Sequence, residues 1–129
     1  SEKLKKPMVY IRKKPKGFGI NKQIEGDFHK NQSALLVEDL ATDGGSKITF
    51  INAMREAELE VKDIFVIFYY DIFDFKKSDL FKLNVKIHSL CTWKNIIEYI
   101  EKNNLYTEKE ILDLKIFLSN PNKWRENNG

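Results

Sequence analysis

The segment Ser33-Ala-Leu-Leu-Val-Glu-Asp-Leu-Ala-Thr-Asp-Gly-Gly-Ser-Lys47 passes from apolar to acidic and then to small residues. Residues 33–37 form a short continuous apolar run, which is typical of a central parallel strand buried on both faces. Residues 42–46 have turn chemistry, and an apolar periodicity of helical spacing begins at Ile48. The order of strand, glycine turn and helix indicates an α/β fold.

Strands and helices continue to alternate on both sides of this segment. Further strands are predicted over residues 8–12, 61–70 and 85–90, where β-branched and aromatic residues gather. Helices are predicted around 80–83, over 93–100 and over 107–118, the last opened by a capping box. This alternation predicts a mainly parallel sheet flanked by helices, with ligands at the carboxyl ends of its strands. A site is therefore expected just after Val37.

Composition limits what the chain can be. Its 129 residues, 42% of them apolar, predict a single domain over 1–129 with a loose tail over 120–129. Charges of both signs sum to only +3, which gives generic nucleic-acid binding no support. Cys91 is the only cysteine, so no internal disulfide can form, and a cytoplasmic protein is expected. No apolar run suggests a membrane span or a signal peptide, and the isolated His29 and His88 predict no metal site.

The acidic and glycine-rich parts of the segment suit one kind of ligand. Backbone N–H groups of a glycine turn, backed by a helix N-terminus, cradle phosphate, and the hydroxyls of Thr42 and Ser46 add donors. The carboxylates of Glu38 and Asp39 can accept hydrogen bonds from sugar hydroxyls. A phosphorylated sugar would satisfy both halves. The alternatives are a solvated surface turn and a Walker-type loop, but the Gly-Lys-Ser/Thr ending of the latter is absent.

The same segment resembles the phosphoribosyl-diphosphate signature of the type I phosphoribosyltransferases. In that signature an apolar strand runs into two acids, a short threonine-containing stretch and a small-residue phosphate turn. The resemblance implies that Glu38 and Asp39 hold ribose and that Mg²⁺ arrives on the diphosphate substrate rather than in a protein cage. It assigns the 5-phosphate to Thr42, Asp43, Gly44, Gly45 and Ser46.

A basic segment lies upstream, Tyr10-Ile-Arg-Lys-Lys-Pro-Lys-Gly-Phe-Gly19, followed by Ile24-Glu-Gly26. Displacement of pyrophosphate requires positive charge on the leaving group, and a closing loop would also exclude water. The alternatives are a solvated basic loop over residues 13–31, which composition alone would favour, and a patch that touches nucleic acid. The segment resembles the catalytic loop of the orotate phosphoribosyltransferases, which implies that Arg12, Lys13 and Lys16 bind pyrophosphate, with Asp39 also catalytic. In that family the loop reaches the neighbouring subunit's site, so a homodimer is implied.

The resemblance implies a C-terminal portion of an orotate phosphoribosyltransferase. Such an enzyme transfers ribose 5-phosphate from phosphoribosyl diphosphate to orotate, giving orotidine 5′-phosphate and pyrophosphate in pyrimidine (UMP) synthesis. The chain begins with Ser1 shortly before its first predicted strand, so the N-terminal hood and pyrophosphate turn are expected to precede it and the chain alone to be inactive. The alternative is a non-catalytic regulatory module that binds phosphoribosyl diphosphate.

Three positions depart from the family's pattern. Phe18 stands where many members have a histidine, and Asp43 stands in the turn where threonine or alanine is common. The side chain of Asp43 is expected to turn away from a phosphate and cap the following helix. Many members also have an arginine where this chain continues into Tyr69 and Tyr70, which leaves the orotate contact open between these tyrosines and core packing.

Overall fold

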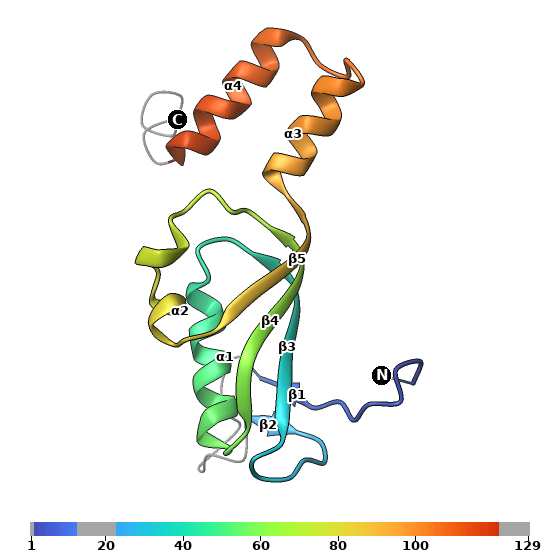
Figure 1. The fold of residues 1–129 in the computed structure, drawn as a ribbon, viewed down its shortest axis with the longest axis vertical. Helices are drawn as coiled ribbons and strands as arrows, with labels where there is room; N and C mark the ends of the chain where they lie inside the picture. Colours follow the sequence, from blue (N-terminus) through green and yellow to red (C-terminus); the bar gives the residue numbers. More distant parts are fainter. Residues whose placement is uncertain (1, 13–22, 122–129) are drawn as a thin grey trace.

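A three-stranded parallel sheet forms the centre of the molecule (Figure 1). The computed structural model describes residues 2–12 and 23–121. The strands β3 (Ser33–Ala41), β4 (Glu60–Tyr69) and β5 (Lys86–Thr92) lie in the order β3-β4-β5. The mainly parallel α/β architecture expected from the sequence is therefore confirmed.

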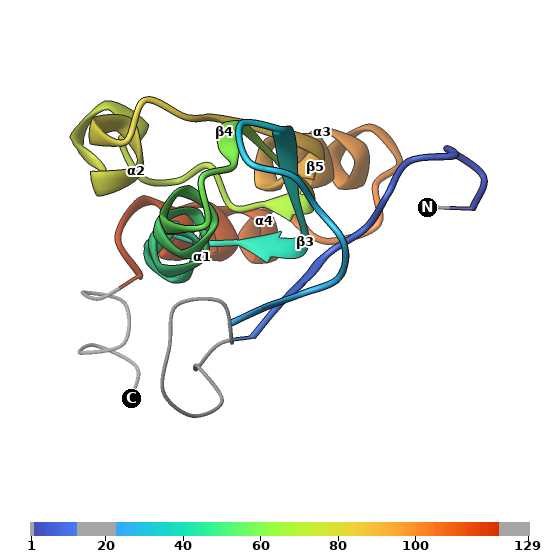
Figure 2. The same cartoon turned by 90° about the horizontal axis from the view of Figure 1, so that it is seen from below.

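Helices connect the strands as the periodicity predicts. Helix α1 (Gly45–Glu56) leads from β3 to β4, and the short helices η2 (Phe75–Lys77) and α2 (Asp79–Lys82) lie between β4 and β5. Viewed along the strands, α1 and α2 lie on the same side of the sheet (Figure 2). Helices α3 (Trp93–Lys102) and α4 (Glu108–Ser119) extend beyond the carboxyl ends of the strands (Figure 1).

The register of β3 against β4 makes β3 longer than the strand predicted over residues 33–37. Pairing runs from Ser33 opposite Glu60 to Ala41 opposite Tyr69, with one irregularity between Ala34 and Leu35. The sequence predicts an end at residue 37 because the apolar run stops there, but the parallel ladder continues through the two acids. Backbone pairing does not depend on apolar side chains, so the strand continues to the turn.

The hydrophobic core lies between the sheet and α1. Ile51 and Met54 of α1 and Ile64 and Val66 of β4 are almost completely buried. The prediction that residues 33–37 form a central strand buried on both faces is wrong, because β3 is an edge strand in the described sheet and its Val37 is 62% exposed. A continuous apolar run cannot reveal which of its neighbours cover it.

A separate antiparallel ribbon precedes the sheet. It pairs β1 (Tyr10–Ile11) with β2 (Ile24–Glu25), and the buried side chain of Ile24 joins the core cluster. The predicted strand over 8–12 is thus reduced to two residues, and the predicted loop over 13–31 is wrong at β2. Two isolated residues give no periodicity from which a strand could be predicted.

Side-chain caps fix the starts of the last two helices. The Thr92 hydroxyl accepts from the backbone N–H of Asn95 at the start of α3, and the Thr107 hydroxyl accepts from the N–H of Glu110 at the start of α4. Hydrogen bonds from Thr107, first from its side chain and then from its backbone, lower the pKa of Glu110. The predicted capping box is therefore confirmed. Of the tail predicted over 120–129, residues 122–129 lie outside the described chain.

No helix within residues 2–12 and 23–121 combines the length and the apolar character needed to cross a bilayer.

The turn between β3 and α1 can be tested through its two glycines. Gly44 has φ of 85°, and a Cβ there would lie 2.2 Å from Leu80 Cδ1, whereas a Cβ on Gly45 would meet no atom closer than 3.5 Å. Gly44→Ala should therefore lower the free energy of unfolding by about 2 to 4 kcal/mol, through left-handed strain and overpacking. Urea denaturation measures this loss, and Gly45→Ala is the matched control, expected to change stability by about 0.5 kcal/mol or less. Equal losses in the two variants would contradict the prediction.

Candidate functional site

The turn predicted to bind phosphate lies at the carboxyl end of β3 and opens α1. Gly44 is its N-cap, in the left-handed conformation and without a side-chain cap. The N–H groups of a first helical turn have no intrahelical acceptors, so they are available to a ligand or a nearby side chain. Within the described chain, Ser46 donates no hydrogen bond from its backbone N–H or its hydroxyl. The turn therefore offers donors to an anion at the start of a helix.

Asp43 occupies part of the same turn. Its Oδ1 accepts a hydrogen bond from the backbone N–H of Gly45 at 3.0 Å and from the Thr42 hydroxyl at 3.4 Å. The expectation that Asp43 caps the helix is wrong, because the N-cap is Gly44 and has no side-chain cap; the carboxylate instead binds the N–H of Gly45, the first residue of α1. The Gly45 N–H is thus already satisfied, and a phosphate would meet the negative charge of Asp43 beside the donors of Ser46.

The two adjacent acids have different surroundings. Consecutive residues of a strand point to opposite faces of a sheet. Glu38 is half-buried and forms an ion pair with Lys47 of α1, whereas Asp39 is exposed. The side chain of Asp39 makes no hydrogen bond or ion pair to any described residue. Of the pair, Asp39 is the carboxylate left without a protein partner.

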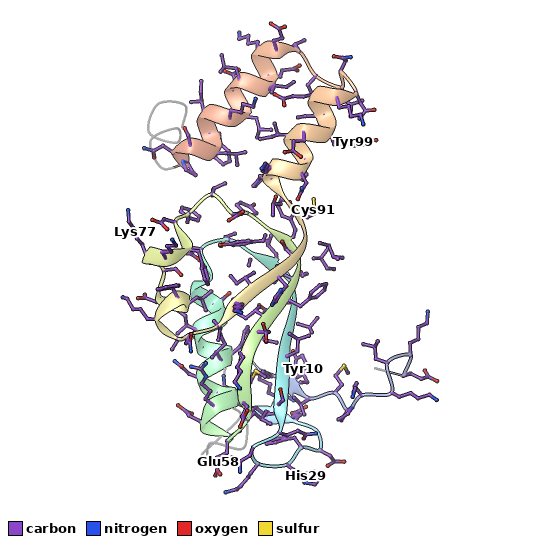
Figure 3. All side chains as sticks on the ribbon, viewed as in Figure 1. Tyr10, His29, Glu58, Lys77, Cys91 and Tyr99 are labelled. Carbon is purple, nitrogen blue, oxygen red and sulfur yellow. The ribbon has the colours of Figure 1, made fainter. Side chains whose placement is uncertain are left out.

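Arg12 does not lie near the turn. It follows β1 and pairs with Glu25 of β2, donating from Nε to Oε1 at 2.7 Å and contacting the same oxygen through Nη2. The ribbon lies toward the start of β3 (Figure 1), and Tyr10 of β1 is well separated from Cys91 near the strand ends (Figure 3). The predicted pyrophosphate ligands Lys13 and Lys16, together with Phe18, lie outside the described residues.

Aromatic side chains gather at the carboxyl ends of β4 and β5. Phe68, Tyr70 and Trp93 pack edge to face, with ring centroids 5.5 to 5.8 Å apart. Tyr69 is partly buried against the core, and this burial, followed by the charge of Asp71, raises its pKa. These contacts favour the packing interpretation of both tyrosines over the orotate contact.

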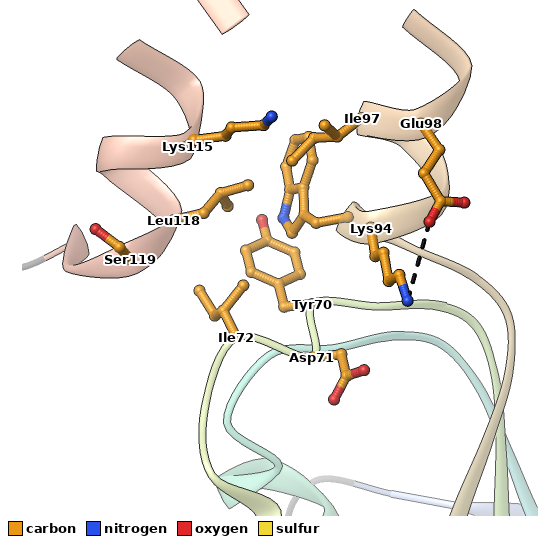
Figure 4. Close-up of a pocket in the computed structure, with 10 residues that line it drawn as sticks. Tyr70, Asp71, Ile72, Lys94, Ile97, Glu98, Lys115, Leu118 and Ser119 are labelled. Carbon is orange, nitrogen blue, oxygen red and sulfur yellow. Dashed lines mark ion pairs between the residues drawn. The ribbon is translucent and has the colours of Figure 1, made fainter. Parts of the chain in front are cut away.

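A cavity that sequence reasoning missed lies between this cluster and the last two helices. Its volume is about 410 Å³, and its lining includes Tyr70, Trp93 and Leu118 (Figure 4). The indole Nε1 of Trp93 is buried without a hydrogen-bond partner among the described residues. The apolar spacing of Trp93 and Ile97 predicts a buried helix face, but only the tertiary structure shows that this face leaves a space beside the sheet.

The remaining residues considered as metal or redox candidates have ordinary surroundings. His88 Nε2 lies 2.7 Å from Asp63 Oδ1 on the neighbouring strand, and both side chains are about half exposed. Cys91 is a free thiol. Within the described part of the chain, no group of three or more His, Cys, Asp or Glu side chains is arranged to hold a metal ion.

The sheet is parallel, helices flank it, and a glycine turn follows β3. This is the fold of a type I phosphoribosyltransferase. Two solved structures support this class. Leishmania donovani UMP synthase matches with a TM-score of 0.73 and 25% identity, over 91% of this chain and 25% of that one. The orotate phosphoribosyltransferase of Aeropyrum pernix matches with a TM-score of 0.64 and 29% identity, over 82% of this chain and 56% of that one.

Within that class, the chain is a relative of the orotate phosphoribosyltransferases. It is 44% identical over 128 residues to that of Roseobacter denitrificans and 40% identical over 129 residues to that of Sinorhizobium fredii. These matches cover 99% and 100% of this chain, which spans 57% and 56% of the two relatives. The chain therefore spans a little more than half the length of these relatives, and the resemblance inferred from the motifs is confirmed. No protein-family model matches the chain.

The environment of Tyr69 gives a prediction about pH. Because its folded-state pKa is raised above the ordinary 10.0, ionisation is disfavoured in the folded protein, and stability should fall as the pH rises from 10.0 through the folded value. Tyr69→Phe should remove this part of the loss, which urea denaturation on either side of pH 10.0 would measure. In Asp71→Asn, absorbance titration of tyrosinate should show a lower Tyr69 pKa that burial keeps above 10.0. An identical alkaline loss in wild type and Tyr69→Phe would contradict the assignment.

Proposed function

We propose that the protein of which this chain forms part is an orotate phosphoribosyltransferase, which joins orotate to ribose 5-phosphate and releases pyrophosphate. The observation that carries the proposal is that the side chain of Asp39, near the end of β3, has no partner in the described chain, while Ser46, at the start of α1, has open donors. Both residues lie within a chain that is 40% to 44% identical to curated orotate phosphoribosyltransferases. That similarity favours an enzyme over a regulatory module that only binds phosphoribosyl diphosphate.

The phosphoribosyl group of the substrate is proposed to lie across the end of β3. Asp39 accepts hydrogen bonds from ribose hydroxyls, and the half-buried Glu38 contributes through the part of its side chain that remains exposed. The 5-phosphate binds the turn of residues 42–46, where Ser46 supplies its backbone N–H and hydroxyl and the helix dipole of α1 favours negative charge. These contacts position C1 of ribose rather than attack it.

The cationic residues are proposed to act on a neighbouring copy of the chain. Arg12 follows β1, and the ribbon lies toward the start of β3, whereas the turn follows the end of that strand (Figure 1). A strand of nine residues is about 25 to 30 Å long, which is more than an arginine side chain can reach. In a homodimer, the pyrophosphate bound by one copy can instead contact Arg12, Lys13 and Lys16 of the other copy.

Chemistry at this site is proposed to rely on positioning and charge. No described side chain near the turn is placed as an activated nucleophile, so direct displacement through an oxocarbenium-like transition state is the expected route. Cationic side chains neutralise the departing pyrophosphate. The carboxylate of Asp39 suits Mg²⁺, which prefers oxygen ligands and usually retains water and substrate phosphates. When bound with the substrate, Mg²⁺ supplies charge neutralisation on the diphosphate.

Removing the charge of Asp39 should weaken substrate binding. Asp39→Asn is expected to reduce affinity for magnesium phosphoribosyl diphosphate by about tenfold or more, because hydrogen bonds to a charged acceptor contribute about 1.5 to 3 kcal/mol. Calorimetric titration measures the change. Asp113→Asn is the matched control, since Asp113 is an exposed carboxylate of α4 and belongs neither to β3 nor to the turn. Unchanged affinity in Asp39→Asn would remove ribose binding from this residue, and absence of binding by the wild type would overturn the function proposed for this chain.

Freeing Arg12 should strengthen the binding of pyrophosphate. Its pair with Glu25 is exposed at both ends, and such pairs contribute about 0 to 1 kcal/mol, so a multiply charged anion can replace the carboxylate. Glu25→Gln is therefore expected to tighten magnesium pyrophosphate binding by a few fold, with less effect at high salt because screening weakens exposed charges. Titration at two salt concentrations measures this effect, with Glu60→Gln as the control. Weaker binding in Glu25→Gln would show that the pair orders Arg12 for its ligand.

A further inference from the structure

Lys47 is a buried cation that directly follows the candidate phosphate turn of residues 42–46. It is the third residue of α1 and only 5% exposed, and it is the sole charged residue of the described chain that belongs to the buried interior. Lysine is almost never fully buried unless its amine has a partner. A charge retained in the core at this place therefore requires an explanation that the phosphate cradle alone does not give.

The partner of Lys47 is Glu38. The amine Nζ contacts Glu38 Oε2, and the two side chains are 6% and 21% exposed. Oε2 itself is sealed from solvent and accepts no further hydrogen bond from the described residues, so the amine is its compensating group. Oε1 is not sealed in this way. Loss of the amine would leave a buried carboxylate without compensation, which is strongly unfavourable.

The two residues of the ion pair lie at either end of the chain segment that forms the candidate site. Glu38 belongs to β3 and Lys47 to α1, so all residues assigned to ribose and 5-phosphate lie on or between these two positions. Backbone bonds reinforce the same arrangement, since the Lys47 N–H donates to the Gly44 carbonyl at 3.0 Å and the Tyr70 N–H donates to the Ala41 carbonyl at 2.9 Å. The pair therefore fixes the end of the strand relative to the start of the helix.

The pair also changes the charge that a phosphate would meet. Glu38, Asp39 and Asp43 all lie on or beside the turn, and like charges there oppose the binding of an anion. The amine of Lys47 offsets the charge of Glu38 at close range in a poorly solvated place, where screening by salt is weak. Asp39 and the exposed part of Glu38 remain for neutral ribose hydroxyls.

We propose that Lys47 is a positioning residue of the phosphoribosyl site, which holds Glu38 by Oε2 so that Oε1 meets a ribose hydroxyl. This inference rests on the proposed function. Lys47 touches no substrate atom itself. Its effect passes through Glu38, and a variant at one position should therefore have less effect when the other has already been changed.

Calorimetric titration with magnesium phosphoribosyl diphosphate tests this role in the full chain. Lys47→Met keeps the length of the side chain but removes its charge, and it is expected to lower affinity about tenfold, while Lys47→Arg restores most of the loss. In a Glu38→Gln background, Lys47→Met should change affinity by about twofold or less. Lys30→Met is the matched control, because Lys30 pairs with Glu58 and precedes the start of β3, whereas the turn follows the end of that strand.

Folding is followed in parallel by circular dichroism and urea denaturation. If Lys47→Met does not fold, the comparison uses Lys47→Arg and the neutral double variant Glu38→Gln, Lys47→Met, in which no buried charge is left alone. Equal affinity of wild type, Lys47→Arg and the double variant would overturn the positioning role while leaving the proposed function intact. A wild type that binds no phosphoribosyl diphosphate would overturn both, and an affinity loss in Lys47→Met that persists unchanged in the Glu38→Gln background would overturn the coupling.

Discussion

The parallel ladder between β3 and β4 is the constraint on which the rest of the structure depends. It carries β3 through Glu38 and Asp39 as far as Ala41, so the strand ends directly at the glycine turn. Helix α1 then returns along one face of the sheet and buries Ile51 against β4 (Figure 1). Without that ladder the acids would belong to a loop, and neither their direction nor their distance from the turn would be fixed.

The alternation of side chains along an extended strand gives the two acids separate roles. Glu38 turns toward α1 and meets Lys47, whereas Asp39 remains exposed with no protein partner in the described chain. One carboxylate therefore helps to hold the turn in place, and the other is left for a ligand. A pair of adjacent acids in a signature need not act as two equivalent ligands, because the pleat of the strand separates their environments.

The same sheet separates the candidate phosphate turn from the ribbon of β1 and β2, which Arg12 follows. Strand β3 has the turn at one end, and β1 and β2 lie toward the other (Figure 1). Arg12 is held there by Glu25 in an exposed pair. A site that needs both the turn and the arginine cannot be completed within one copy of the described chain, and this is the structural basis for proposing a dimer.

The features that the sequence by itself determined are those that depend on residues close together along the chain. Apolar runs, helical spacing and the capping box of Thr107 and Glu110 predicted the strands and helices of an α/β sheet, because these signals depend on near neighbours. The carboxylates and glycines of residues 38–46 predicted an anion site for the same reason. Only the tertiary structure decided that β3 lies at the sheet's edge, that Lys47 is buried against Glu38 and that Arg12 is remote from the turn. These three features depend on contacts between segments that are distant along the chain. Such contacts produce no repeating pattern in the sequence from which they could be predicted.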